Sequence, residues 1–169
     1  DGSIRKNSQE AIVYGAKVAS QTGGSALVLA IGEASEDELA KAGRFGAEKV
    51  LYVKKDENIM AYARVVTEVV KSTGATVVVA ARSALSDAVL ARAAGALKAG
   101  FAGNVTSLPD TSSGFTVTRS IFSGKAFAQT AITSDIRILA IKKNTVDVTE
   151  GSGTAPVETL SIDTSAEDG

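Results

Sequence analysis

The sequence predicts an α/β domain with a mainly parallel, doubly wound sheet and helices on both faces, followed by an antiparallel β meander. Short, mainly apolar runs recur at residues 26–31, 49–53 and 76–80. Such runs are typical of parallel strands that are buried on both sides. The segments between them carry apolar residues at helical spacing, which predicts alternating strands and helices. After residue 108 the apolar residues alternate in twos, as in half-buried strands.

The first helix is predicted over residues 7–21. Asn7 and Glu10 have the spacing of a capping box, in which two side chains satisfy free backbone N–H groups at a helix start. Gly23 and Gly24 follow the last apolar position and are expected to end the helix.

A second helix is predicted to begin after Ser35, which forms a cleaner capping box with Glu38. Residues 36–38 are all acidic. A metal site or an acid/base site is one interpretation of these carboxylates. Acids in a first helical turn are, however, favoured by the helix dipole and need no further cause. We therefore expect capping here, and Gly46 then leads into the strand at 49–53.

A third helix is predicted over residues 58–72, with one apolar face and with Gly74 as its C-cap. Tyr62 lies on that apolar face. A base or a flavin could stack on its ring, but an aromatic residue on a helical apolar stripe is typical of a core. We expect Tyr62 to belong to the core.

The strand at residues 76–80 is expected to be the central one, and the helix after it is predicted over residues 86–97. The loop between them lies at the carboxyl end of a parallel strand, where open α/β sheets usually bind ligands. Arg82, Ser83 and Ser86 offer a guanidinium, two hydroxyls and a helix N-terminus, which makes them the best anion-binding candidates in the chain. The alternative is that Ser86 only caps the helix and Arg82 is only solvated.

The C-terminal third is predicted to hold the meander, a Gly/Ser/Thr-rich linker and one last alternating strand. The meander strands lie at residues 115–122, 126–132 and 136–141, the linker at 149–154 and the last strand at 157–162. A strand after a linker is expected to pair outside its own domain. The chain therefore divides into an α/β scaffold domain at 1–148, whose first strand is missing, and a linker and terminal strand at 149–169. Because the only methionine is Met60, we expect a chain that starts at Asp1 to be processed or part of a longer one.

Composition excludes several kinds of chemistry. The chain has no histidine and no cysteine, which removes Ser-His and Cys-His nucleophiles, disulfides and nearly all zinc sites. With 18 basic and 19 acidic residues it has no global basic field, so we expect no nucleic-acid binding. The longest apolar run is far shorter than the roughly 20 residues that cross a bilayer. Gly124-Lys125 is not a P-loop, because Arg119 replaces the first glycine and Ala126 replaces the Ser or Thr.

A series of short landmarks runs along nearly the whole chain. They are the Asp1-Gly2 turn, SQEA at 8–11, GAEKVL at 46–51, ARAA at 91–94, NVTSL at 104–108 and RSIFSGKA at 119–126. In this order they resemble the amino-terminal domain of the alpha subunit of electron transfer flavoprotein. Two positions depart from that family. Its Gly-Arg-Asp helix start is ALSD at 84–87 here, and its later Thr-x-Arg is replaced by AIKK at 140–143.

The resemblance implies a nucleotide alpha-hydrolase-like fold and a non-enzymatic role in a heterodimeric electron carrier. Such a carrier accepts electrons on FAD from flavin dehydrogenases of the acyl-CoA dehydrogenase type, as in fatty acid oxidation, and passes them to a membrane-bound acceptor. FAD would be bound mainly by a carboxyl-terminal domain to which residues 149–169 lead, and the beta subunit partner could hold AMP. The location would be cytoplasmic, or the mitochondrial matrix in a eukaryote.

The same resemblance suggests residues at the partner interface, namely Arg119, Phe122, Lys125, Val157, Leu160 and Ile162. The rival hypothesis is a free-standing adenine-nucleotide-binding module of the stress-protein type that uses the Arg82 loop. That hypothesis needs a phosphate-binding glycine signature, which the sequence lacks.

Overall fold

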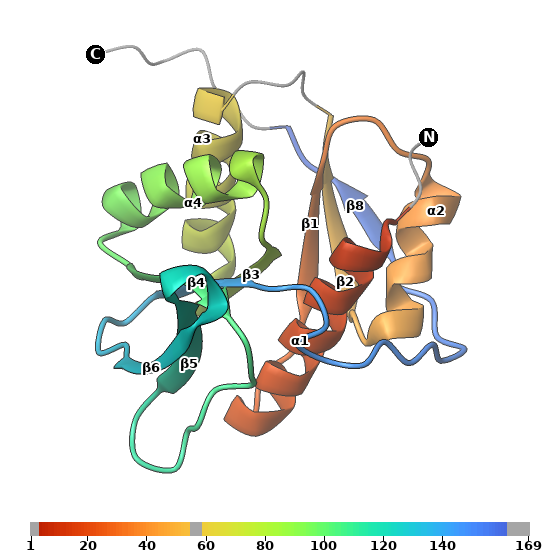
Figure 1. The fold of residues 1–169 in the computed structure, drawn as a ribbon. Coiled ribbons are helices and arrows are strands. Elements are labelled where there is room, and N and C mark those ends of the chain that lie inside the picture. The colour runs from red at the N-terminus through yellow and green to blue at the C-terminus, as the bar shows by residue number, and fades with distance from the viewer. Residues whose placement is uncertain (1–3, 55–58, 162–169) are drawn as a thin grey trace.

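The computed structural model describes residues 4–54 and 59–161. Its helices are α1 (Lys6–Thr22), α2 (Glu36–Ala40), α3 (Ile59–Thr73) and α4 (Ala84–Leu97), with short 3-10 segments η1 (Lys41–Phe45) and η2 (Phe122–Gly124). Its strands are β1 (Leu27–Ile31), β2 (Lys49–Val53), β3 (Val77–Ala81), β4 (Gly100–Val105), β5 (Thr116–Ile121), β6 (Ala126–Ala131), β7 (Arg137–Ile141) and β8 (Val157–Thr159). Figure 1 shows how these elements are arranged.

The described strands form two hydrogen-bonded sheets. The smaller has the order β1-β2-β8 and is parallel throughout. The larger has the order β3-β7-β4-β5-β6, in which β3, β7 and β4 are parallel while β5 and β6 run antiparallel. The α/β class with a mainly parallel sheet is therefore confirmed.

Helices cover both faces of these sheets. On one face α1 packs against the larger sheet through Tyr14 and Val18, and with α2 it covers the smaller sheet. On the other face α3 and α4 share a core with β3 and β7, and α3 also covers β2 through Val65 and Val69. Because α1 and α3 each contact both sheets, they join the two sheets into one layered body (Figure 1).

The prediction of a strand at 76–80 with both faces packed is confirmed, but its expected central position is wrong. Val77 and Val79 pack toward α1, whereas Val78 and Ala80 pack toward α3 and α4. In its ladder β3 pairs with β7 and ends the sheet order. The middle one of the three parallel strands is β7, which lies between β3 and β4 and is parallel to both.

The expected place of β7 in the meander is therefore also wrong. Its last four residues, 138–141, are at most 2% exposed, as a parallel strand between two neighbours requires. Only β5 and β6 pair as predicted, in an antiparallel hairpin. The strand β4 was not predicted, because its sequence GFAGNV is rich in glycine, Asn104 has a positive φ of 55° and the pairing with β7 is irregular after Ala102.

The last described strand pairs inside the domain, so the expectation that it pairs elsewhere is wrong. Val157 lies opposite Val50 in the parallel ladder of β2 and β8. An ion pair between Lys49 and Glu158 adds a second link between these strands. The division of the chain at residue 148 stays a prediction.

The predicted linker is bound to the domain as well. The Ala155 N–H donates to the Ala40 carbonyl at 3.0 Å, and the Gly151 N–H donates to the Arg44 carbonyl at 2.7 Å. The backbone at Thr154 passes so close to η1 that a Cβ added to Gly43 would lie 2.4 Å from the Thr154 carbonyl carbon. We call residues 150–156 the strap, because they tie η1 to β8.

Two of the predicted helix starts need correction. The N-cap of α1 is Arg5 and makes no side-chain cap bond, so the predicted Asn7–Glu10 capping box is wrong. The N-cap of α4 is Ser83, which places the helix start two residues before the predicted one. By contrast, the Ser35 hydroxyl accepts from the Glu38 N–H at 3.2 Å, which is one half of the capping box predicted for the start of α2, while the Glu38 carboxylate pairs with Lys41.

The predicted end and core face of α3 are confirmed. Gly74 has a positive φ of 69°, and its N–H donates to the Val70 carbonyl at 3.0 Å, which closes the last turn. Tyr62 is 9% exposed and packs in the cluster between α3 and α4. Asn58, the predicted first residue of α3, lies outside the described residues.

The buried phenol of Tyr14 makes stability sensitive to alkaline pH. Its hydroxyl donates to the Ser107 carbonyl at 2.8 Å, and burial raises the pKa of Tyr14 well above its usual value of about 10. A group whose pKa is raised by folding stabilises the protein fully below its unfolded pKa, and this contribution is lost progressively as pH rises from the unfolded pKa through the folded pKa. We expect Tyr14→Phe to lower the free energy of unfolding at pH 7 by about 1 kcal/mol. Above pH 10 its stability should fall less steeply than that of wild type.

Urea unfolding of both proteins at pH 7, 9, 10.5 and 11.5 measures this difference. If the two stabilities fall with the same slope above pH 10, the pH-dependent role of Tyr14 is wrong.

Candidate functional site

The carboxyl ends of β3 and β7 meet at one edge of the larger sheet, where the best anion-binding candidates of the sequence lie. Val77 to Ala81 run parallel to β7, and the Arg82 N–H donates to the Ile141 carbonyl at 3.0 Å. The chain then turns directly into α4. This is the topological position at which open α/β sheets usually bind ligands.

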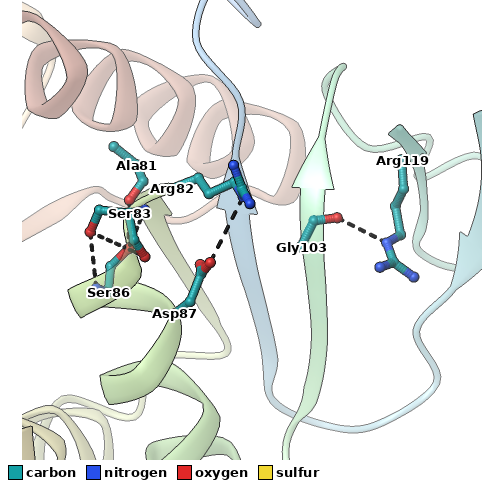
Figure 2. Close-up of polar contacts among 7 residues, drawn as sticks. All are labelled: Ala81, Arg82, Ser83, Ser86, Asp87, Gly103 and Arg119. Carbon is teal, nitrogen blue, oxygen red and sulfur yellow. Dashed lines mark hydrogen bonds and ion pairs between the residues drawn. The ribbon is translucent and has the colours of Figure 1, made fainter. Parts of the chain in front are cut away.

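Both predicted serines cap α4, which leaves little for a ligand to bond (Figure 2). The Ser83 hydroxyl accepts from the Ser86 N–H, and the Ser86 hydroxyl accepts from the Ser83 N–H, each at 3.0 Å. The Ser86 hydroxyl also donates to the Ala81 carbonyl at 2.8 Å. A hydroxyl has one proton to donate, so the proton of Ser86 is already committed. The geometry favours the capping alternative.

The guanidinium of Arg82 pairs with a carboxylate of its own chain. Its Nε lies 3.8 Å from Oδ2 of Asp87, and Figure 2 draws this ion pair as a dashed line. Asp87 is in the first turn of α4, where its negative charge complements the helix dipole. An anion bound at this helix N-terminus would be repelled by the same carboxylate.

The hollow beside Arg82 is too small for a nucleotide. Its lining residues are Asn7, Glu10, Ala81, Arg82, Ile141, Lys142 and Lys143. Its volume is about 10 Å³, the room that one water molecule needs, whereas ligand pockets usually hold about 300–1,000 Å³.

A second hollow lies between the start of α1, η1 and the strap. Its volume is about 340 Å³, and its lining residues are Ile4, Gln9, Glu38, Lys41, Arg44, Phe45 and Glu150. The Glu38–Lys41 and Arg44–Glu150 ion pairs neutralise the charges on its wall. Ligand pockets are mostly apolar with a few polar groups, and this wall has the opposite character.

An FAD molecule does not fit either hollow of the described chain. The strand-end hollow has the volume of one water molecule, and the second offers paired charges where an isoalloxazine ring needs apolar surface. Within residues 4–54 and 59–161, no three acidic side chains gather where a metal ion could bind. No described helix is long and apolar enough to cross a membrane.

The interface residues implied by the resemblance fall into two separate places. Arg119, Phe122 and Lys125 belong to the β5–β6 hairpin, which forms the outer end of the larger sheet. The Arg119 Nε donates to the Gly103 carbonyl of β4 at 2.9 Å (Figure 2).

The other three residues lie near the smaller sheet or outside the described chain. Val157 and Leu160 are half-buried and pack against this domain's own core, and Ile162 lies outside the described residues. Their contact with a partner stays a prediction.

One exposed aromatic residue of the hairpin was missed. Phe127 in β6 is 67% exposed, compared with 75% for Phe122 in the same hairpin. The signal was present in the sequence, because AFAQTA at 126–131 alternates without any charged residue. An uncharged outer strand with an exposed aromatic side chain is unusual for a free sheet edge.

Fold and site together define a doubly wound α/β domain. In the loop after β3, where such domains usually bind ligands, the serine hydroxyls cap α4 instead. The comparison with protein families gives the particular kind of domain. Residues 1–165 match the model of the electron transfer flavoprotein domain, so the chain belongs to that family. Members of this family are flavoproteins that carry electrons. A comparison with curated proteins finds no match.

Proposed function

We propose that this chain is the amino-terminal scaffold and interface domain of the alpha subunit of a heterodimeric electron transfer flavoprotein. The observation that carries the proposal is the family match, which extends over residues 1–165. The closed strand-end loop supports the scaffold role, because the serines at that edge cap α4 and the hollow there has room for about one water molecule.

In this proposal FAD is bound mainly by a further domain of the alpha subunit, with help from a beta subunit that could itself hold AMP. The carrier receives electrons from flavin dehydrogenases of the acyl-CoA dehydrogenase type and delivers them to a membrane-bound acceptor. The family match supports an electron-carrying flavoprotein in general, and the paired charges of the larger hollow support a flavin site elsewhere. The proposed location is the cytoplasm, or the mitochondrial matrix in a eukaryote.

Flavin absorbance tests this division of labour. Residues 1–169 are purified alone, and separately as part of the complete alpha subunit co-expressed with the beta subunit, both with added FAD. We expect less than about 0.1 FAD per chain for the single domain and about one FAD per complete heterodimer, since the binding surface lies outside the domain. Stoichiometric, tight FAD binding by residues 1–169 alone would contradict the proposal.

A further inference from the structure

We propose that the turn of the β5–β6 hairpin is a preformed docking knob that inserts Phe122 into an apolar socket with an acidic rim on the beta subunit. This inference rests on the proposed function for the identity of the partner. Its own evidence is the exposure, the backbone conformation and the charge of the hairpin. We call residues 119–127 the knob.

The knob presents the two most exposed large apolar side chains of the described chain. Phe122 is 75% exposed and Phe127 is 67% exposed. In the β5–β6 ladder Phe127 lies opposite Ser120, two positions before Phe122. Two exposed aromatic rings in one short hairpin are typical of a contact surface, because aromatic anchors dominate the energy of protein interfaces.

The backbone of the knob adopts a costly conformation that exposes Phe122. Phe122, Ser123 and Gly124 have consecutive positive φ values of 50°, 55° and 85°. A non-glycine residue in this region costs on the order of 1 kcal/mol or more. Phe122 recovers little of this cost by burial in its own domain, since three-quarters of its surface is exposed. Contact with another molecule would offset the cost.

The knob is held in place before any partner binds. Six consecutive residue pairs join β5 to β6, and the Lys125 N–H donates to the Phe122 carbonyl at 3.1 Å across the turn. Arg119 fastens the hairpin to β4 through the Gly103 carbonyl. A rigid contact surface loses little conformational entropy on binding, which favours affinity.

The positive charge of the hairpin favours binding to a different protein over binding to a second copy of this chain. Residues 115–131 contain Arg119 and Lys125 and no acidic residue. Two knobs that met across a two-fold axis would bring like charges together. A partner with acidic residues around an apolar socket would complement the knob. The uncharged outer edge of β6, with which no other described strand pairs, would be covered in the same complex.

Calorimetry tests the knob: this chain is titrated with the purified beta subunit from the same organism, and the dissociation constant of the pair is measured. We expect Phe122→Ala to raise the dissociation constant at least about ten-fold, and Lys125→Glu to raise it several-fold with a weaker effect at high salt. Phe122→Asn provides a second variant, because asparagine tolerates a positive φ while it removes the ring. Leu85→Ala is the matched control: Leu85 is 42% exposed on α4, and its variant should bind within two-fold of wild type.

The outcomes separate this inference from the proposed function. Binding by wild type with equal affinity for both Phe122 variants overturns the knob and leaves the proposed function standing. No binding by wild type overturns both. If ultracentrifugation shows a self-association that Phe122→Ala abolishes, the occupant is a second copy, and the assignment to the beta subunit is wrong.

Discussion

Replacing Gly43 with alanine is expected to lower the free energy of unfolding by about 2–3 kcal/mol and to loosen β8 from β2. An added Cβ would lie 2.4 Å from the carbonyl carbon of Thr154 and 2.6 Å from the Ala155 nitrogen. Both contacts are with backbone atoms, which cannot rotate away as a side chain can. The strap would have to move outward, and the Ala155–Ala40 hydrogen bond would be lost with it.

Amide hydrogen exchange locates the effect within the chain. The Val50 N–H donates to the Pro156 carbonyl, and the Leu160 N–H donates to the Tyr52 carbonyl. We expect exchange at Val50 and Leu160 to accelerate at least about ten-fold in Gly43→Ala, because local opening exposes both amides. Urea unfolding gives the change in global stability.

Gly95→Ala is the matched control for this substitution. Gly95 lies within α4, and an added Cβ there would meet nothing within 4 Å. Since alanine favours helix over glycine, this variant should gain up to about 1 kcal/mol of stability. If Gly43→Ala were as stable as Gly95→Ala, the close approach of the strap to η1 would have no energetic role.

Removing the carboxylate of Glu10 is expected to cost about 3 kcal/mol of stability in Glu10→Ala and about 2 kcal/mol in Glu10→Gln. Glu10 is 4% exposed, yet its oxygens accept three backbone N–H groups, from Asn144, Thr145 and Val146. Alanine would leave all three donors without their acceptor. Glutamine keeps one acceptor oxygen but places an NH₂ group against a backbone N–H, so the loss is partial.

Urea unfolding of the Glu10 variants beside Glu48→Gln measures this effect. Glu48 is exposed, and its variant should remain within about 0.5 kcal/mol of wild type. Exchange at the amides of 144–146 should accelerate most in Glu10→Ala. Equal stability of Glu10→Gln and Glu48→Gln would show that the buried carboxylate does not hold this loop.

The elements that the sequence predicted well are those defined by local pattern. The strand at 49–53 is apolar after Lys49 and coincides with β2. Gly74 ends α3 because a positive φ is required there, and Ser35 caps α2 because its hydroxyl reaches a free N–H. Each of these outcomes depends on neighbours within a few positions, so single-sequence reasoning reaches it.

The errors concern partners that are far apart in the chain. Glu10 was interpreted as half of a capping box, but its carboxylate binds an amide 134 residues away. Likewise, an apolar run such as 136–141 fits an antiparallel meander or a parallel ladder equally well, because periodicity does not specify the neighbouring strand. Val157 has the same ambiguity, since an alternating strand can pair with any free edge.

The candidate site was predictable in position but not in role. Arg82, Ser83 and Ser86 lie at the carboxyl end of β3, as expected. Whether a hydroxyl there binds a ligand or a backbone amide depends on distances of a few tenths of an ångström, which spacing does not encode. Phe122 lies in a turn of three residues with positive φ, Phe122, Ser123 and Gly124. Of these three residues only the glycine is typical of such a conformation, so the sequence gives little sign of it.

The place of β7 between β3 and β4 has a consequence for the order in which the chain can fold. As the chain leaves the ribosome, β3 and β4 emerge before β7, and the strand that joins them follows only after the whole β5–β6 hairpin. Until then each has an open apolar edge that invites pairing with other chains. Closure of such non-local parallel pairs is slow, so the nascent protein is most prone to aggregation in the interval before residue 141 emerges.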